Sequence, residues 1–174
     1  MTFSAPTDRR GMVVLNREEC EQRLSSVSIG RLGVVVAGEP MIFPVLFRFV
    51  DGVIVFRTAS GAKMDAVWIG AAVSFEADAW DAAKRVGWSV IVRGRAETVH
   101  DPQETGKFEA LGLEDWIPRQ QPTTWVRLRP TELSGRRIPE QHDQLAYWTR
   151  ASARLDVDVT TDPNWSMLMR NALA

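Results

Sequence analysis

The sequence predicts a mainly β protein with peripheral helices, built as a closed, six-stranded antiparallel barrel. Apolar and β-branched runs of strand length recur through residues 31–138. Two of the connections between these runs are too short for anything except hairpins, which makes the neighbouring strands antiparallel. The segments with a helical pattern are short and lie before or between these strand runs in the sequence. Closure into a barrel removes the exposed edges that an open sheet of six strands would leave.

Composition limits the class of protein. The chain has 174 residues, 45% of them apolar and 25% charged, which fits one globular domain. A formal charge of −1 and a pI near 6.1 argue against a nucleic-acid partner. No apolar run approaches the about 20 residues that a membrane-spanning helix needs. With a single cysteine and no recognisable secretory signal, we expect a cytoplasmic protein.

The N-terminal half divides into an arm, a helix and three strands. Residues 1–14 are expected to form an N-terminal arm, because the segment is polar and lacks periodicity over most of its length. Asn16 is the expected N-cap of a helix that runs to about Ser26. Residues 31–59 then contain three strand runs, separated by the turn signals Gly38-Glu39-Pro40 and Asp51-Gly52.

The C-terminal half alternates helices and strands before an irregular tail. We expect a short helix over 61–69, strands over 71–80 and 88–100, a helix over 102–111 capped by Asp101, and a sixth strand over 123–138. In the sixth strand, Val126 and Leu128 should face the core. Trp125, Arg127 and Arg129 should form the other face, which is expected to be polar or to contact a partner. The barrel domain thus spans 15–138, and residues 139–174 form a tail that packs on the barrel or on a partner subunit.

The stretch VIVFRTASGAKMDAVW, residues 53–68, is the most suggestive local feature. A buried strand runs into a turn with two cations, Arg57 and Lys63, and two hydroxyls, Thr58 and Ser60. A helix that begins near Gly61 would point free N–H groups and its positive dipole end at an anion in this turn. The same residues also fit a plain capped helix start, and neither a P-loop nor a GxGxxG spacing is present.

A longer arrangement identifies a family. The run GEPMIFPVLFRFVDGVIVFRTASGAKMDAV is followed by AAVSFEADAW and then by GWSVIVRGRAETV. This order of pieces resembles the flavin-binding split-barrel family typified by pyridoxamine 5′-phosphate oxidase, in particular its nitroimidazole-reductase-like and actinobacterial branch. The resemblance covers residues 15–137 and implies FMN bound at the interface of a homodimer.

The resemblance also implies which residues hold the cofactor. The phosphate end would contact Arg57, Thr58, Ala62 and Lys63. The isoalloxazine ring would lie along Phe43, Pro44, Val45 and Leu46, with Arg48 nearby. Trp88 and Ser89 would approach from the partner subunit. Each of these residues also has an ordinary structural reading, as core, solvated or interface side chain.

Departures from the family pattern argue against some of the activities known in the family. Phe43 stands where the oxidase has an arginine beside the flavin, and residues 164–174 lack the oxidase's C-terminal signature, which argues against vitamin B6 oxidation. Arg57 stands where the nitroimidazole-reductase-like proteins carry a histidine. Some relatives bind a deazaflavin instead, whose longer acidic tail would need further cations. Those available are Arg127, Arg129, Arg136 and Arg137.

Other chemistries find little support. Two histidines and one cysteine give no zinc spacing, and Cys20 on the first helix suits a packed apolar role. Glu76 and Asp78 share one face of a strand, which is more often solvated than catalytic. The sequence therefore predicts a flavin-dependent oxidoreductase that moves electrons from a reduced nicotinamide or deazaflavin donor to a small acceptor. A non-catalytic flavin- or deazaflavin-binding module, and a barrel whose pocket has decayed, remain the alternatives.

Overall fold

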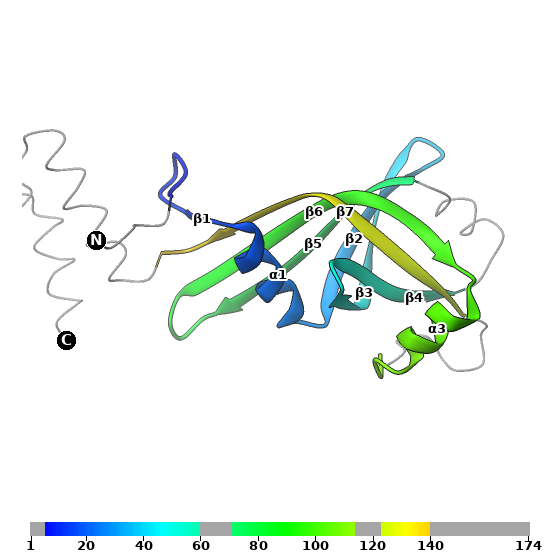
Figure 1. The fold of residues 1–174 in the computed structure, drawn as a ribbon. Coiled ribbons are helices and arrows are strands. Elements are labelled where there is room, and N and C mark those ends of the chain that lie inside the picture. The colour runs from blue at the N-terminus through cyan, green and yellow to red at the C-terminus, as the bar shows by residue number, and fades with distance from the viewer. Residues whose placement is uncertain (1–5, 60–70, 114–122, 140–174) are drawn as a thin grey trace, which may run out of the picture.

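The computed structural model describes residues 6–59, 71–113 and 123–139 (Figure 1). The elements in this part of the chain are β1 (Val13–Leu15), α1 (Arg17–Ser25), β2 (Ile29–Val36), β3 (Glu39–Val50), β4 (Val53–Ala59), β5 (Ala71–Asp81), β6 (Val86–Val99), α3 (Pro102–Glu109) and β7 (Thr123–Arg137). The helix expected over 61–69 and all but the first residue of the expected tail lie outside the described residues.

The strands form the predicted antiparallel barrel. Their order is β1-β7-β4-β3-β2-β5-β6, and a further pairing of β6 with β7 closes the ring, so that six strands, β2 to β7, make up the barrel. Every ladder in the described part of the chain is antiparallel. The seventh strand, β1, adds to the outer end of β7 and was not predicted, because three residues are too few to show an alternating pattern.

Two hairpin turns fix the register of β2, β3 and β4. Ala37 and Gly38 have φ values of 52° and 87°, and Asp51 and Gly52 have φ values of 49° and 77°. Two successive residues with positive φ form the turn that matches the twist of a two-residue hairpin, and glycine adopts this conformation without steric cost. The two turn signals in the sequence therefore correctly predicted this meander, although the first turn lies at Ala37-Gly38, and Glu39 and Pro40 already belong to β3.

Helix α1 packs on β1, β3, β6 and β7. Asn16 caps it as predicted: its side chain accepts from Glu19 N–H at 2.9 Å, and the Glu19 carboxylate accepts from Asn16 N–H at 2.7 Å. Cys20 and Leu24 are buried on the side of the helix that meets the barrel. Burial raises the pKa of the Cys20 thiol, so this cysteine behaves as a small apolar side chain, as predicted.

The barrel interior is one continuous core. Alternating residues of six strands point inward, and Phe47 packs edge-on against Phe75 with ring centroids 4.8 Å apart. The fully buried side chains of this core include Leu24, Leu32, Phe47, Ile54, Phe56, Phe75, Val90, Val92, Val126 and Leu128. Phe43 and Val45, which were predicted to lie along a flavin ring, turn their side chains toward the same core.

A second, smaller core lies outside the barrel under α3. Asp101 caps this helix and Pro102 is its first residue, as predicted, and the helix ends at Glu109, two residues earlier than expected. Phe108 packs against Trp125 with ring centroids 5.5 Å apart. The prediction of a polar or partner-facing surface on β7 is therefore wrong at Trp125, which is only 5% exposed, because α3 covers it.

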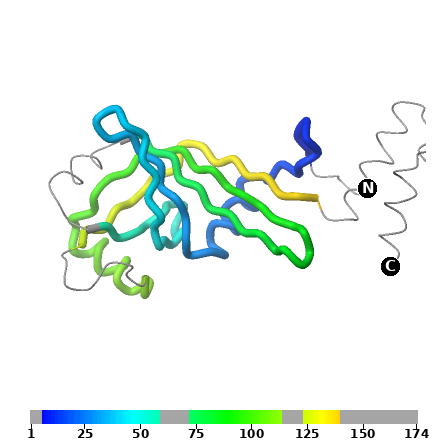
Figure 2. Tube along the Cα trace, turned by 180° about the vertical axis from the view of Figure 1, so that it is seen from behind, coloured from blue at the N-terminus to red at the C-terminus, as the bar shows by residue number. Residues whose placement is uncertain are grey.

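The β5–β6 hairpin extends beyond the barrel on the side away from α3 (Figures 1 and 2). Beside it, Pro6 accepts a hydrogen bond from Val14 N–H at 2.7 Å, and Asp8 forms an ion pair with Arg136 of β7 at 3.2 Å. Residues 6–14 are thus held against β7 through β1. Among the described helices, none has the length and apolar character needed to cross a bilayer.

Candidate functional site

The barrel opens between β3 and β4. These strands pair through only four residue pairs, from Val50 with Val53 to Phe47 with Phe56. β3 nevertheless runs back to Glu39, and β4 runs on to Ala59. We call this opening the split, defined by residues 39–46 of β3 and 57–59 of β4. In the described part of the chain, no strand pairs with the β4-facing edge of residues 39–46.

The β2–β3 register fixes which backbone groups face the split. Across the two-residue turn, Val36 and Glu39 form a hydrogen-bonded pair, so odd-numbered residues of β3 bond to β2 and even-numbered residues point toward β4. Phe47 N–H donates to Ser28 O at 2.8 Å, in agreement with this alternation. The even positions along the split are Pro40, Ile42, Pro44 and Leu46. Because proline has no N–H, Ile42 and Leu46 supply the backbone donors of this edge.

The side chains of β3 divide between the two faces of the sheet. Leu46 packs toward the outer core, opposite to its neighbour Val45. Arg48 is half-buried, and its Nη1 donates to Phe47 O at 3.1 Å. Pro44 is exposed. The structure thus brings backbone groups of the predicted ring-contacting residues to the edge of the split, with Arg48 at the point where the β3–β4 ladder begins.

Arg57 stands at the other edge of the split and is firmly positioned. Its Nε donates to Thr123 Oγ1 at 3.2 Å, and its Nη2 lies 3.4 Å from Glu109 Oε1. The guanidinium stacks over the Trp125 ring at 5.2 Å, and the side chain is 23% exposed. A planar guanidinium that is held on one side by a carboxylate and an indole keeps a fixed direction, as recognition of a phosphate group requires.

These neighbours of Arg57 were not predicted from the sequence. Glu109 also accepts from Trp125 Nε1 at 2.9 Å, so one carboxylate orients both the cation and the indole beneath it. A signal did exist, because an acidic residue in the last turn of a helix opposes the helix dipole and needs a cationic partner. The identity of that partner depends on how α3 docks, which the local sequence does not encode.

Arg127 anchors α3 to the barrel. Its guanidinium contacts Glu97 of β6 at 2.7 Å and Glu104 of α3 at 2.8 Å, and its side chain is 15% exposed. The hydrogen bond from Arg127 holds the pKa of Glu97 below the ordinary glutamate value, although partial burial opposes this shift. The ion-paired cluster fixes the helix that carries Glu109, and so contributes to the position of Arg57.

The remaining phosphate-site residues are only partly described. Thr58 pairs with Thr124 of β7 and, by strand alternation, its side chain lies on the opposite face from Arg57. Ala62 and Lys63, the other two predicted contacts, lie outside the described residues. The structure therefore does not test the proposed contacts of Ala62 and Lys63 with the cofactor phosphate.

Trp88 and Ser89 lie far from Arg57 along the same sheet. Trp125, the β7 partner of Arg57, pairs with Val99 of β6. Trp88 lies eleven residues before Val99, which corresponds to roughly 35 Å of extended strand. Within one chain, these two residues do not join the split. They belong to the projecting end of the β5–β6 hairpin, as the prediction of a partner-subunit contact would require.

Other predicted groups have structural roles. Glu76 and Asp78 share one face of β5, as predicted, and both pair with Arg31 of β2. Burial and the neighbouring Asp78 raise the pKa of Glu76, while Arg31 opposes the shift. Within residues 6–59, 71–113 and 123–139, no three His, Cys, Asp or Glu side chains are grouped so as to hold a metal ion.

The arginines named for a deazaflavin tail are largely engaged within the chain. Arg127 and Arg129 both contact Glu97, and Arg136 pairs with Asp8. Arg137 is elsewhere, paired with Trp88 near the projecting end of the β5–β6 hairpin. The structure therefore does not gather these four cations at the split.

With this geometry in view, comparison with known proteins identifies the family. Residues 16–137 match the model of the family described as pyridoxamine 5′-phosphate oxidase. The chain belongs to this family, and the predicted resemblance is confirmed.

Individual relatives agree with this assignment. An uncharacterised protein of Mycobacterium tuberculosis is 35% identical over 140 residues, which cover 78% of this chain and 91% of that protein. The structure of a Corynebacterium glutamicum protein is 38% identical, has a TM-score of 0.66, and is matched over 73% of this chain and 98% of its own. A Mycobacterium smegmatis protein described as FAD-binding is also 38% identical, with a TM-score of 0.62 and coverage of 73% and 100%. Solved relatives thus include flavin-binding proteins.

Proposed function

We propose that this protein binds a flavin in the split and works as an oxidoreductase. In this proposal it moves electrons from a reduced nicotinamide or deazaflavin donor to a small-molecule acceptor. The observation that carries the proposal is the early end of the β3–β4 ladder, which leaves a polar backbone edge beside a fixed arginine. A flat ring with hydrogen-bonding groups along one edge and a phosphate at its tail is complementary to this arrangement.

The residues of the chain have distinct parts in binding. The N–H groups of Ile42 and Leu46 and the carbonyls of β3 would meet the polar edge of the ring system. Arg57 would hold the phosphate end, with its direction fixed by Glu109, Thr123 and Trp125. When bound, the flavin supplies the redox chemistry, and the protein positions it and tunes it by hydrogen bonds and charge.

The form of the flavin is a further part of the proposal. FMN is the cofactor that the sequence predicts, and its ring and phosphate are shared with FAD. The FAD-binding relative at 38% identity adds FAD as an equal candidate. A deazaflavin is less well supported, because Arg127, Arg129 and Arg136 are paired with carboxylates rather than gathered at the split. Heat release followed by mass spectrometry distinguishes the three cofactors.

A homodimer is part of the same proposal. Trp88 and Ser89 cannot reach the split of their own chain, so they would contact flavin only from a second copy. Large apolar side chains on β2 and β3 also remain exposed, including Val35 at 68% and Ile42 at 73%, and a dimer would give them a partner. The buried lone cysteine is consistent with the reducing cytoplasm that we propose as the setting.

Replacement of Arg57 by methionine tests the site. Methionine keeps an apolar stem over Trp125 but removes the charge, so flavin affinity should fall by about tenfold to a hundredfold while the fold is retained. Arg129→Met is the matched control, since Arg129 is a paired arginine on the outer face of β7, away from the split. Flavin absorbance after gel filtration reads out binding. Equal flavin content in the two variants would sink the assignment of Arg57.

Turnover is tested separately from binding. If the protein is a reductase, the absorbance of its bound flavin should bleach anaerobically on addition of a reduced nicotinamide or a reduced deazaflavin. A flavin that stays oxidised with both donors would favour the non-catalytic binding module instead. Because the flavin remains bound whether or not it is reduced, this experiment tests turnover independently of binding.

A further inference from the structure

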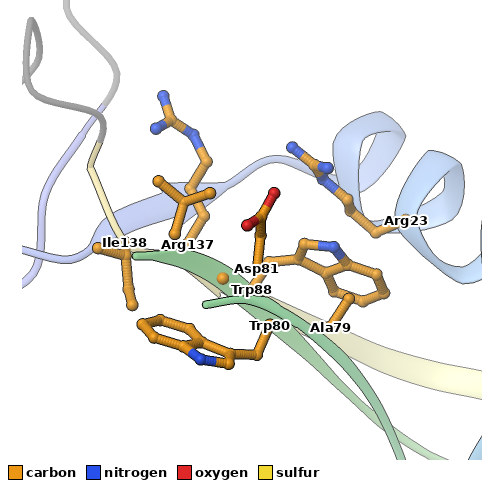
Figure 3. A pocket seen from close by; sticks show the side chains of 9 residues that line it. Arg23, Ala79, Trp80, Asp81, Trp88, Arg137 and Ile138 are labelled. Atoms are coloured by element: carbon orange, nitrogen blue, oxygen red, sulfur yellow. The ribbon is translucent and has the colours of Figure 1, made fainter. Parts of the chain in front are cut away.

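The projecting end of the β5–β6 hairpin has two different faces (Figure 3). Trp80 of β5 pairs with Gly87 of β6. Because successive residues of a strand point to opposite faces, the side chain of Trp88, the next residue of β6, points away from Trp80. The Trp88 face meets the barrel core and α1, where the Arg23 guanidinium lies 5.7 Å from the Trp88 ring centre. The Trp80 face is the outer surface of the sheet.

Apolar side chains gather on this outer surface beside the end of β7. Trp80 is 59% exposed, although it lies against Gly87, where an added Cβ would stand 2.8 Å from Trp80 Cε3. Ile138 donates its N–H to Gly87 O at 2.8 Å and turns its side chain to the Trp80 face (Figure 3). Ile91, on the same face of β6, is 44% exposed. We call these four residues the Trp80 surface, and exposed apolar groups of this kind indicate a covering partner.

The C-terminal segment, residues 140–174, follows directly from this surface. Ile138 is hydrogen-bonded to Gly87, which is the residue paired with Trp80. The first cluster of large apolar side chains in the segment is LAYW, residues 145–148. An extended linker of about seven residues from Ile138 spans up to roughly 23 Å, so this cluster can reach the indole of Trp80.

Two further observations favour this segment as the partner. The family match ends at residue 137, so the segment lies beyond the family domain and can cover a surface that the domain leaves exposed. The segment also begins with two carboxylates, Glu140 and Asp143. Arg85, exposed in the nearby hairpin turn, has no carboxylate within ion-pair distance in the part of the chain that the structure describes. These opposite charges are complementary.

We propose that residues 145–148 dock on the Trp80 surface of their own chain and cover it. Tyr147 and Trp148 pack against Trp80 and Ile138, and the carboxylates that precede them lie near the hairpin turn. A segment tethered so close has an effective concentration on the order of millimolar, which favours it over a second copy. The C-terminal segment thus supports the projecting hairpin from the face opposite Trp88. This docking does not depend on the flavin proposed for the split.

Photo-cross-linking in the full-length protein tests which segment covers Trp80. Benzoylphenylalanine is placed at Trp80 or, as a control, at Lys107 on the exposed side of α3. We expect the probe at Trp80 to link to residues 145–148 at about fivefold or higher yield than the control. Mass spectrometry maps the link, and denaturing electrophoresis separates links within a chain from links between copies. Links to residues 1–5 or to a second copy instead, equal yields at the two positions, or no links would each overturn the proposal.

A double-mutant cycle tests the same contact without a probe. Trp80→Ala and the paired change Tyr147→Ala with Trp148→Ala should each raise the unfolding equilibrium constant. Their combined effect should be smaller than the product of the two by about threefold to tenfold, because both changes remove one contact. Val35→Ala replaces Trp80→Ala in the control cycle, since Val35 is exposed at the other end of the outer surface, and there the effects should multiply. Urea unfolding at one protein concentration measures every variant. Effects of Trp80→Ala and the paired change that multiply would contradict the docking.

Discussion

The two sides of the barrel differ in how completely their backbones are paired. β6 pairs with β7 through twelve residue pairs and with β5 through eleven, so the backbone of that side is largely satisfied by its own ladders. β3 and β4 share only four pairs, although both strands continue. Buried backbone groups must find partners, so a ladder that stops early leaves groups available for something other than a strand. The closed side supplies rigidity, and the split supplies a place to bind.

Proline substitution should reveal this difference most strongly. Ile91 of β6 lies between two paired strands, so Ile91→Pro removes a ladder hydrogen bond and should cost about 3 kcal/mol or more. Ile42 of β3 points its N–H into the split, between two natural prolines, so Ile42→Pro should cost less than about 1 kcal/mol. Urea unfolding of the flavin-free protein measures both. Equal losses would show that the two edges do not differ.

The orientation of Arg57 gives a smaller and more specific effect. Thr123→Val removes the hydroxyl that accepts from Arg57 Nε while it keeps the branched shape of the side chain. We expect flavin affinity to fall by about threefold to tenfold and stability to change by less than about 1.5 kcal/mol. Thr131→Val is the matched control, because the Thr131 hydroxyl donates to Arg93 O at 3.1 Å on the closed side. If both variants bind flavin alike, Thr123 does not position Arg57.

The smallest effect concerns the anchor of α3. The pKa of Glu97 is lower in the folded protein than in the unfolded chain, so its contribution is present above the ordinary glutamate pKa near 4.5 and is lost as pH falls through the lowered folded value. Glu97 is 42% exposed, which limits the contribution to less than about 1 kcal/mol. Thermal unfolding should show Glu97→Gln less stable than the natural protein at pH 7, with the gap closing in acid. A gap that is constant with pH would contradict this.

Much of the fold was readable from the sequence because its signals are local. Asn16 and Asp101 are cap residues, and Asp51-Gly52 is a hairpin turn, so the chain near each of them determines the outcome. The burial of Trp125 was not readable in this way, because it depends on where α3 docks. The docking is fixed by the contacts of Arg127 with Glu97 and Glu104, which join three separate segments.

The sequence predicted which residues contribute to the candidate site, but not that the barrel opens there between β3 and β4. Family resemblance pointed to Phe43–Leu46 and to Arg57, yet strand patterns do not show where a ladder ends. Pro40 and Pro44 were the available signal, because two prolines spaced by four in one strand remove donors from the same edge. That spacing predicts an edge without a continuous strand partner, which is what the register of β3 shows.

Residue-resolved amide hydrogen exchange with and without added flavin tests the central claim most directly. If the flavin lies in the split, the N–H groups of Ile42 and Leu46 should exchange more slowly when flavin is bound, because the alternation of β3 points them at the opening. Val90 and Val92, inside the closed ladders of β6, should be unchanged. Failure of the protein to take up FMN or FAD, or uptake that leaves Ile42 and Leu46 unprotected, would contradict the account.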